Sequence, residues 1–262
     1  GPHTILLFED TCADWMTCAL GALSQSLVVA TAYATLGIGA VGEAIKASNI
    51  TTVVTNRKNE ERVAGLKKQC PTLQTIIYTE FHVAPEDQGK AVSVPKGLTA
   101  IPLADCFAFE PTREAAEPTP EQVAVIMYTS GTTGAPKGVV LAHSNVLASM
   151  AGLNDSADLT NQDVYLAYLP LAHIMEMAAE CLMMALGAAI GYGSPQTLTD
   201  TGLKLAPGSR GDAPTLQPTF MVFAPAVLDR VRQAVQAKFA AASPLLKKLV
   251  GAGLAAGERE FH

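Results

Sequence analysis

The 262-residue sequence has few charged side chains. Asp, Glu, Lys and Arg make up 16% of it, against about 25% in an average soluble domain, so much of the surface is expected to be buried or to face something apolar. The 24 acidic residues outnumber the 18 basic ones and give a net charge of -6. Nucleic-acid binding requires a concentrated basic face, and the composition argues against it.

Cysteines are also few. The five that occur are far apart in the sequence and form no Cys-x-x-Cys pair, which argues against a disulfide framework and against a zinc site. We therefore expect buried thiols in a reducing, intracellular compartment. A secretory signal is absent as well, and the chain begins at Gly1-Pro2 without Met, which is typical of an excised piece of a longer protein.

Charge is missing altogether from residues 15–42. This run is long enough to cross a bilayer, for which about 20 apolar residues suffice. It is interrupted by six Ser, Thr and Gln residues, and Gly37, Gly39 and Gly42 would weaken a helix. A buried helix followed by a buried strand is therefore the favoured interpretation, with a membrane-spanning helix as the alternative.

Apolar strand patterns and helical patterns alternate along the first 80 residues. The strand patterns lie at residues 5–8, 27–30, 51–55 and 75–78, and the helical ones at 15–23, 43–48 and 59–68. This alternation predicts an α/β fold with a doubly wound, mainly parallel sheet covered on both faces.

Two stretches look like linkers because they are rich in Pro, Gly, Ser, Thr or Glu: residues 81–120 and 193–218. Between them, residues 123–128 predict a core strand, and residues 164–192 predict a second block of structure. Strand-like FMVF at 220–223 and a basic helix from Ala226 follow. We interpret residues 1–262 as one partial domain.

The segment YTSGTTGAPKGV, residues 128–139, follows the predicted core strand and is suited to bind phosphate. Its glycines let successive backbone N–H groups converge on an anion, its hydroxyls donate further hydrogen bonds, and its lysine adds a mobile charge. The candidate phosphate-binding residues are Thr129, Ser130, Gly131, Thr132, Thr133, Gly134 and Lys137. The loop is not a Walker A motif, because its lysine lies between Pro136 and Gly138, and the apolar residues after it predict a strand.

The segment YTSGTTGAPKGVVLAHSNV resembles the signature loop of the adenylate-forming, AMP-binding enzyme superfamily. Further segments resemble its long-chain fatty acyl-CoA synthetase branch, among them FEDTCADWMTCALGALSQSLVVATAYATLG, YLAYLPLAHIMEMAAE and GYGSPQTLTDTGLKLAPG. They cover most of the chain in collinear order. The resemblance implies part of the large N-terminal domain of such an enzyme, with the small C-terminal domain absent.

The resemblance also implies a function, which is ATP-dependent ligation of a long-chain fatty acid to CoA, with Mg²⁺ accompanying the ATP. The fatty acid forms an acyl-adenylate and releases pyrophosphate, and CoA then displaces AMP. The loop would hold the phosphates, and Thr129 would lie near the metal. None of the seven residues is implied to be a catalytic nucleophile.

The resemblance places His173, in PLAHIME, beside the acyl and adenylate pocket, whereas a structural role for a buried His173 is an equal alternative. His143 is expected to orient the turn into a helix, with Ser144 or Asn145 as its N-cap. The methionines at 175, 177, 183 and 184 either line a lipid tunnel or, as favoured here, pack in the core.

The family's later motifs, namely the adenine site, the acidic magnesium ligand and the catalytic lysine, are not found in the sequence. We therefore expect the chain alone to be inactive, within a parent enzyme at a cytoplasmic membrane face such as the endoplasmic reticulum, anchored by a segment not present here. Alternatives are another acid-CoA ligase of the superfamily and a catalytically dead truncated module that binds a partner or lipid.

Overall fold

The computed structural model describes residues 3–34, 36–80, 83–90, 92–110, 114–129 and 137–260. The chain forms two units, Gly1–Met221 and Val222–His262. The strands of the described part belong to the first unit, and the described part of the second unit contains two helices.

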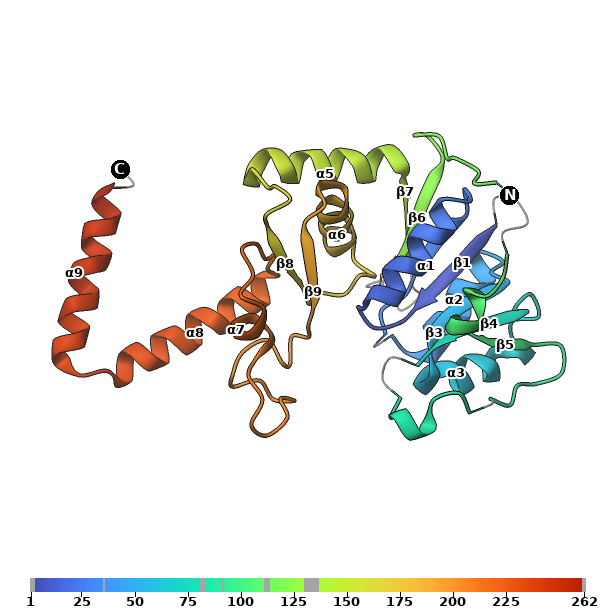
Figure 1. Cartoon of the computed structure of the whole chain (residues 1–262), viewed down its shortest axis with the longest axis horizontal. Coiled ribbons are helices and arrows are strands. Elements are labelled where there is room, and N and C mark those ends of the chain that lie inside the picture. Colours follow the sequence, from blue (N-terminus) through green and yellow to red (C-terminus); the bar gives the residue numbers. More distant parts are fainter. Residues whose placement is uncertain are drawn as a thin grey trace. The chain divides into compact units, whose positions relative to one another are not determined.

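The main sheet of the first unit has seven strands in the order β5-β4-β3-β1-β2-β6-β7. Six are parallel, and β7 is antiparallel to β6 (Figure 1). The strands are β1 (Thr4–Phe8), β2 (Val28–Thr31), β3 (Thr52–Asn56), β4 (Thr75–Thr79), β5 (Thr99–Pro102), β6 (Val123–Thr129) and β7 (Lys137–Ala142). The doubly wound, mainly parallel α/β fold expected from the sequence is thereby confirmed.

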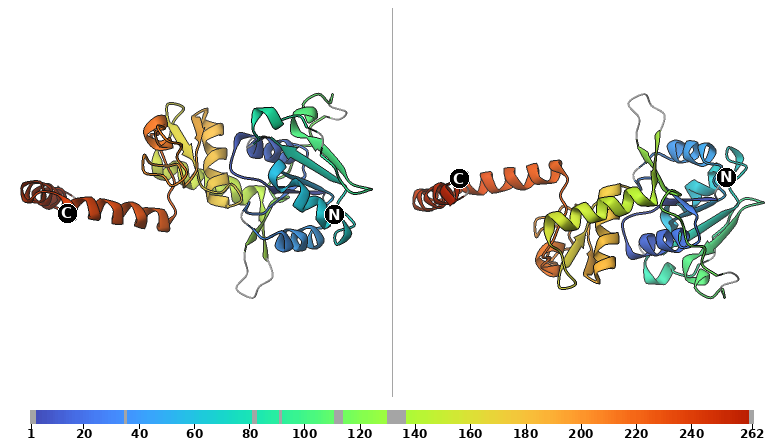
Figure 2. Two further views of the ribbon diagram at one scale, coloured as in Figure 1. Left: turned by 90° about the horizontal axis from the view of Figure 1, so that it is seen from below. Right: turned by 90° about the horizontal axis from the view of Figure 1, so that it is seen from above.

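Helices cover both faces of this sheet, as two further views show (Figure 2). Helix α1 (Ala13–Leu23) connects β1 to β2 and packs on one face. Helices α2 (Ile38–Ala47) and α3 (Arg57–Ala64), the latter continued by η1 (Gly65–Lys68), pack on the other. Crossovers on both sides leave the strands buried, which explains their nearly continuous apolar runs.

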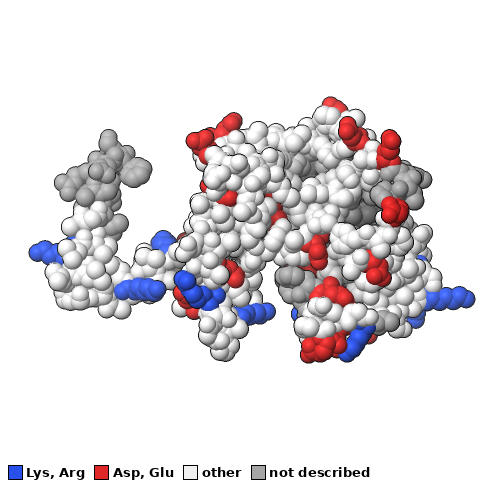
Figure 3. All heavy atoms as spheres, in the orientation of Figure 1, with Lys and Arg blue, Asp and Glu red and all other residues white. Residues whose placement is uncertain are grey.

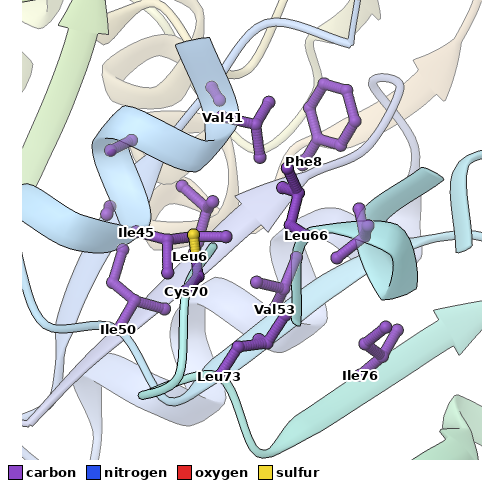
Figure 4. Packing of buried hydrophobic residues seen from close by; sticks show 14 of the residues in the cluster. Leu6, Phe8, Val41, Ile45, Ile50, Val53, Leu66, Cys70, Leu73 and Ile76 are labelled. Atoms are coloured by element: carbon purple, nitrogen blue, oxygen red, sulfur yellow. The ribbon is translucent and has the colours of Figure 1, made fainter. Parts of the chain in front are cut away.

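The two faces have separate hydrophobic cores because successive side chains of a strand point to opposite faces. Leu6 and Phe8 of β1 point to the core shared with α2 and η1 (Figure 4). Leu7, between them, points to the core shared with α1, where Trp15 is fully buried. The sequence ILLF therefore serves both cores.

A second, two-stranded parallel sheet follows in the chain. Its elements are α5 (His143–Ala157), β8 (Val164–Ala167), α6 (Ile174–Leu186), β9 (Ala189–Tyr192) and α7 (Asp212–Leu216). Helix α6 crosses over from β8 to β9 and also packs against α5. The Thr11 hydroxyl, after β1, donates to the Leu169 carbonyl at 2.7 Å and accepts from the Leu171 N–H at 2.9 Å, so this one residue ties the loop after β8 to the main sheet.

Both linker-like stretches contain regular structure. The first includes η2 (Pro85–Asp87), the edge strand β5 and α4 (Leu103–Cys106). Strand β5 was missed because it has four residues and ends in proline, which is tolerated at a sheet edge. The second includes α7, and the Asp212 carboxylate there accepts a hydrogen bond from the Ser194 N–H at 3.0 Å.

The strand expected at residues 220–223 is wrong. Only Phe220 pairs there, in an isolated bridge with Tyr165 of β8. The pattern of four apolar residues cannot distinguish a strand from an apolar segment that packs against a sheet edge.

The uncharged run at residues 15–42 is divided between α1, β2 and the start of α2, which confirms the helix-and-strand interpretation. Across the described ranges, no helix is both long enough and apolar enough to span a membrane.

The second unit contains α8 (Pro225–Ala241) and α9 (Pro244–Glu260). Both helices expose apolar side chains, with Leu245 70% exposed and Val235 61% exposed. Lys and Arg side chains lie along both helices on the face drawn in Figure 3, whereas acidic side chains are spread over the first unit.

Candidate functional site

The parallel strands β1, β3, β4 and β6 end at one edge of the seven-stranded sheet, here called the carboxyl edge. From β1 the chain leads to β2 on one side, and from β3 it leads to β4 on the other. The ends of β1 and β3 therefore flank a topological switch point, which is where open α/β sheets form ligand-binding crevices.

A buried polar network lies at this switch point. Glu9, directly after β1, is 3% exposed. Its carboxyl accepts hydrogen bonds from the Asp10 N–H at 2.8 Å, from Asn56 Nδ2 at 3.1 Å and from Thr79 Oγ1 at 2.6 Å. Asn56 also caps α3, because its Oδ1 accepts from the Asn59 N–H at 3.0 Å. The network joins the ends of β1, β3 and β4.

Burial raises the pKa of Glu9 from 4.5 to about 7, although the donors from Thr79, Asp10 and Asn56 partly oppose the shift. Asp10 lies beside it and raises the pKa further. A carboxyl group that titrates near neutral pH at a switch point is a candidate for a functional role.

The predicted phosphate loop joins β6 to β7 at the same carboxyl edge. Thr129, the last residue of β6, pairs with Lys137, the first residue of β7. Both side chains are exposed, and no ion pair of Lys137 occurs within the described ranges. The lysine charge is therefore free to interact with an anion. The strand that follows confirms that the loop does not lead into a helix N-terminus.

Five of the seven predicted phosphate-binding residues lie outside the described residues. They are Ser130, Gly131, Thr132, Thr133 and Gly134. The structure therefore places Thr129 and Lys137 at the two ends of the loop and leaves the other five as predictions.

Gly138, next to Lys137, allows β7 to approach β6 closely. A Cβ atom at this position would lie 2.8 Å from Ile126 Cγ2 and 3.3 Å from Tyr128 Cε1. Tyr128 is fixed in turn, because its hydroxyl lies 2.7 Å from the Ser48 hydroxyl. The backbone at Gly138 is thus packed against the half-buried Ile126 and the buried Tyr128 of its own hairpin.

His173 is exposed and is the N-cap of α6. Its Nδ1 accepts a hydrogen bond from the Met175 N–H at 3.2 Å. The alternative of a buried His173 is wrong in its burial, but the imidazole does have a structural role, since it accepts from a free helix N–H group. A role in an acyl or adenylate pocket stays a prediction.

The turn between β7 and α5 also differs in detail from expectation. Helix α5 begins at His143, so Ala142 occupies the N-cap position in place of Ser144 or Asn145. The Asn145 side chain nevertheless caps the helix, because its Oδ1 accepts from the Ala142 N–H at 2.9 Å. The polar residue acts from the third helical position, as the acid of a capping box does.

The methionines of α6 are divided between its two faces. Met177 and Met183 are fully buried in the core, whereas Met175 and Met184 are exposed by 50% and 38%. Core packing is confirmed for the first pair, and a place beside a lipid tunnel stays a prediction for the second.

Two further acids lie on the buried face of α6. Glu176 and Glu180 are one turn apart and both are 0% exposed. Tyr165 Oη donates to Glu176 at 2.9 Å, and Tyr192 Oη donates to Glu180 at 2.8 Å. These tyrosines come from β8 and β9, so both strands of the second sheet are hydrogen-bonded to the helix.

The sequence profile of the AMP-binding enzyme family matches residues 2–259, which is nearly the whole chain. The chain belongs to the AMP-binding enzyme family. The match spans the hairpin that carries Thr129 and Lys137, and the assignment of that hairpin as the family's signature loop stays a prediction.

Curated relatives of this AMP-binding chain are fatty acid ligases. It is 37% identical over 238 residues to long chain acyl-CoA synthetase 8 of Arabidopsis thaliana, covering 89% of this chain and 33% of that protein. It is 36% identical over 245 residues to long-chain-fatty-acid–CoA ligase 1 of Schizosaccharomyces pombe, covering 93% and 36%. The chain thus spans about a third of the length of these relatives.

Solved structures share the fold. A structure from Rhodopseudomonas palustris described as a long-chain-fatty-acid CoA ligase matches with a TM-score of 0.65 at 17% identity, over 87% of this chain and 53% of that one. ATP-bound MatB from the same organism matches with a TM-score of 0.58 at 18% identity, over 72% and 34%.

Neither the Glu9 network nor the buried acids of α6 were foreseen from the sequence of this AMP-binding chain. For Glu9, the available signal was an acid directly after a buried parallel strand, which places it at the carboxyl edge. For Glu176 and Glu180, the signal was a pair of acids four residues apart within an otherwise apolar helix that has no basic residue.

Proposed function

We propose that the protein carrying this chain is a long-chain fatty acid–CoA ligase, to which this chain contributes the signature-loop hairpin and the sheet that supports it. The observation that carries the proposal is the identity of 37% and 36% to two long-chain acyl-CoA ligases over 89% and 93% of the chain. A match over 89% or 93% of the chain spans the loop at residues 128–139.

In the proposed reaction, a carboxylate oxygen of the fatty acid attacks the α-phosphorus of ATP. The bond between that phosphorus and the bridging oxygen breaks, and pyrophosphate leaves with the electron pair. In the second step the CoA thiolate attacks the acyl carbonyl, and AMP leaves as the acyl C–O bond breaks. Both steps are displacements that depend on alignment and charge neutralisation.

The residues of this chain would act in the first step. Lys137, exposed and without an ion pair in the described part, would neutralise the developing charge on the pyrophosphate. The Thr129 hydroxyl and the loop residues 130–134 would donate hydrogen bonds to the phosphate oxygens. The pairing of Thr129 with Lys137 supports this role because it holds both ends of the loop together.

Mg²⁺ is proposed to enter as the complex with ATP. The described residues contain no cluster of three His, Cys, Asp or Glu side chains that could hold a metal ion. The Thr129 hydroxyl is the described group that could approach such an ion, at the exposed end of β6.

Membrane association and an intracellular location are further parts of the proposal. All five cysteines are free thiols, which supports a reducing compartment. A long-chain fatty acid partitions into lipid, so we propose that the protein works at a cytoplasmic membrane face such as that of the endoplasmic reticulum.

The proposal is tested by acid-dependent ATP–pyrophosphate exchange on the protein at its natural length. We expect exchange with palmitate and arachidonate and little with benzoate. Exchange with benzoate alone would instead favour another acid-CoA ligase of the superfamily. If none of the three acids supports exchange, the result would favour a binding module without catalytic activity.

A further inference from the structure

The buried acids of α6 lack the partners that an ionised carboxylate needs. Each accepts a hydrogen bond through its Oε2, from Tyr165 or from Tyr192, and a hydrogen bond from the Tyr168 backbone N–H also lowers the pKa of Glu176. The Oε1 atom of each has no hydrogen-bond partner within the described part of the chain. A carboxylate removed from water without a counter-charge carries a large energetic penalty and becomes neutral instead.

The charged and titratable groups around the pair do not supply that counter-charge. On the strand side these are Tyr165 and Tyr192, with Tyr168 in the loop after β8, and burial and the nearby acids raise the pKa of all three phenols. Cys12, before α1, acts on Tyr192, and Cys181 lies next to Glu180 on α6. On α5, which packs against α6, the titratable residues are His143 and Asp155, and neither shifts the pKa of the pair.

Burial accordingly raises the pKa of Glu176 from 4.5 to about 8 and that of Glu180 to about 7. The charge on Glu180 raises the pKa of Glu176 further, while the tyrosine hydroxyls act in the opposite direction. Within the described ranges no third metal-ligating residue joins the pair, so neutralisation by protons is the arrangement that the residues allow.

We propose that Glu176 and Glu180 are held as neutral carboxylic acids and act, with Tyr165 and Tyr192, as a pH-dependent latch that fastens α6 to β8 and β9. Deprotonation places two like charges one helical turn apart in a dry core, so it weakens the attachment of α6. Because His173 is the N-cap of this helix, the latch also fixes the position of His173. The inference concerns the folded chain itself and does not depend on the proposed ligase activity.

The direction of the pH effect follows from the raised pKa values. The folded protein binds two protons that the unfolded chain releases above about pH 4.5. The stabilisation is therefore complete below that pH and is lost as the pH rises through about 7 and 8. Between its unfolded pKa and its folded pKa, each carboxyl group changes the unfolding equilibrium constant about tenfold per pH unit. This pH range is the window of that group.

The test is urea unfolding of the 262-residue chain across this pH range, comparing wild type with Glu176→Gln/Glu180→Gln. The amides keep the size of the acids and accept from the tyrosines but do not titrate. We expect unfolding of the double variant to release about two fewer protons than unfolding of wild type, as measured by the slope of the free energy of unfolding against pH. The exposed pair Glu61→Gln/Glu121→Gln is the matched control and should keep the wild-type dependence.

Two measurements keep the proposal falsifiable if the double variant does not fold. Tyr165→Phe and Tyr192→Phe each remove a hydrogen bond that lowers the pKa of its glutamate, so each should extend the window to higher pH. Infrared spectra of the Glu9→Gln chain in D₂O at about pH 6 should contain protonated-carboxyl absorption from the pair, since that pH lies below both raised pKa values. The Glu9→Gln background removes the absorption of Glu9, whose own pKa is raised to about 7. Any of three results would overturn the latch. The double variant could keep the wild-type pH dependence of unfolding, the Phe variants could move the loss of stability to lower pH, or the protonated-carboxyl absorption could be absent.

Discussion

Thr129 and Lys137 face each other across the antiparallel pair of β6 and β7, with the Thr129 hydroxyl 3.5 Å from the Lys137 carbonyl oxygen. The ends of the loop are therefore anchored in the sheet. A loop that binds phosphate gains from such anchoring, because part of the entropy of ordering it has been spent before the ligand arrives.

Replacing Lys137 tests the role of this loop. In the protein at its natural length, we expect Lys137→Ala to lower kcat/KM for acyl-CoA formation by about 10²–10³-fold, as removal of a group that stabilises transition-state charge does. Thr132→Ala should act in the same direction. Lys96→Ala, at another exposed lysine, is the control. Unaltered kcat/KM in both loop variants would remove the loop from the mechanism.

Gly138→Ala tests the close approach of β7 to β6. The added methyl group would lie 2.8 Å from Ile126 Cγ2, so we expect a loss of about 1–3 kcal/mol in the free energy of unfolding. Gly21→Ala is the matched control, because Gly21 lies in α1 with nothing within 4 Å of the added atom. It should stabilise the protein by about 1 kcal/mol. Equal effects of both changes on urea unfolding would contradict the packing argument.

Glu9 predicts a second contribution to the pH dependence of stability. Its pKa is raised to about 7 in the folded chain, so its contribution is complete below about pH 4.5 and is lost as the pH rises through 7. We expect unfolding of Glu9→Gln to release about one proton fewer than unfolding of wild type. The unfolding equilibrium constant should therefore rise about tenfold less per pH unit between the two pKa values. Urea titrations at several pH values measure this, with Glu61→Gln as control. An unchanged dependence between about pH 4.5 and 7 in Glu9→Gln would show that Glu9 is ionised in the folded chain over that range.

His173 allows capping to be separated from imidazole chemistry. Because its Nδ1 accepts from the Met175 N–H, His173→Ala should lower the free energy of unfolding by about 1 kcal/mol, as loss of an N-cap does. His173→Asn supplies another capping acceptor and should retain the stability. Thermal unfolding of both variants measures the difference, and an Asn variant as unstable as the Ala variant would contradict the cap.

The exposed apolar side chains of α8 and α9 predict self-association of the purified chain. We expect light scattering to give a mass above that of the monomer. Val235→Lys with Leu249→Lys, at positions 61% and 62% exposed, should restore the monomer. Gln233→Lys with Gln236→Lys adds the same charge to exposed polar positions of α8 and should not. A wild-type chain that is monodisperse as a monomer would refute the prediction.

The sequence predicted the elements whose pattern is local. Strands such as β1 and β3 were recognised because their runs are buried on both faces, and β7 was recognised by the apolar residues that follow the loop. Strand β5 was not predicted, because an edge strand needs little apolar sequence and its identity depends on β4, its neighbour in the sheet.

The polar networks were harder to predict because their members are far apart in the chain. Glu9, Asn56 and Thr79 become neighbours only when β1, β3 and β4 are aligned in the sheet. Likewise the acids of α6 are ordinary helix residues until β8 and β9 bring Tyr165 and Tyr192 against them. Register and burial, which a single sequence does not contain, determine the pKa of each of these groups.

The position of β6 in the sheet has a consequence for how the chain folds. β6 pairs with β2, so Val29 lies opposite Val125, whereas β1 pairs with β2 and β3 close by in the sequence. Contacts between distant segments form slowly, because the intervening chain must first be ordered. We therefore expect the strands before β6 to assemble first and the hairpin of Thr129 and Lys137 to be added last, so that nucleotide binding reports completion of the sheet during synthesis.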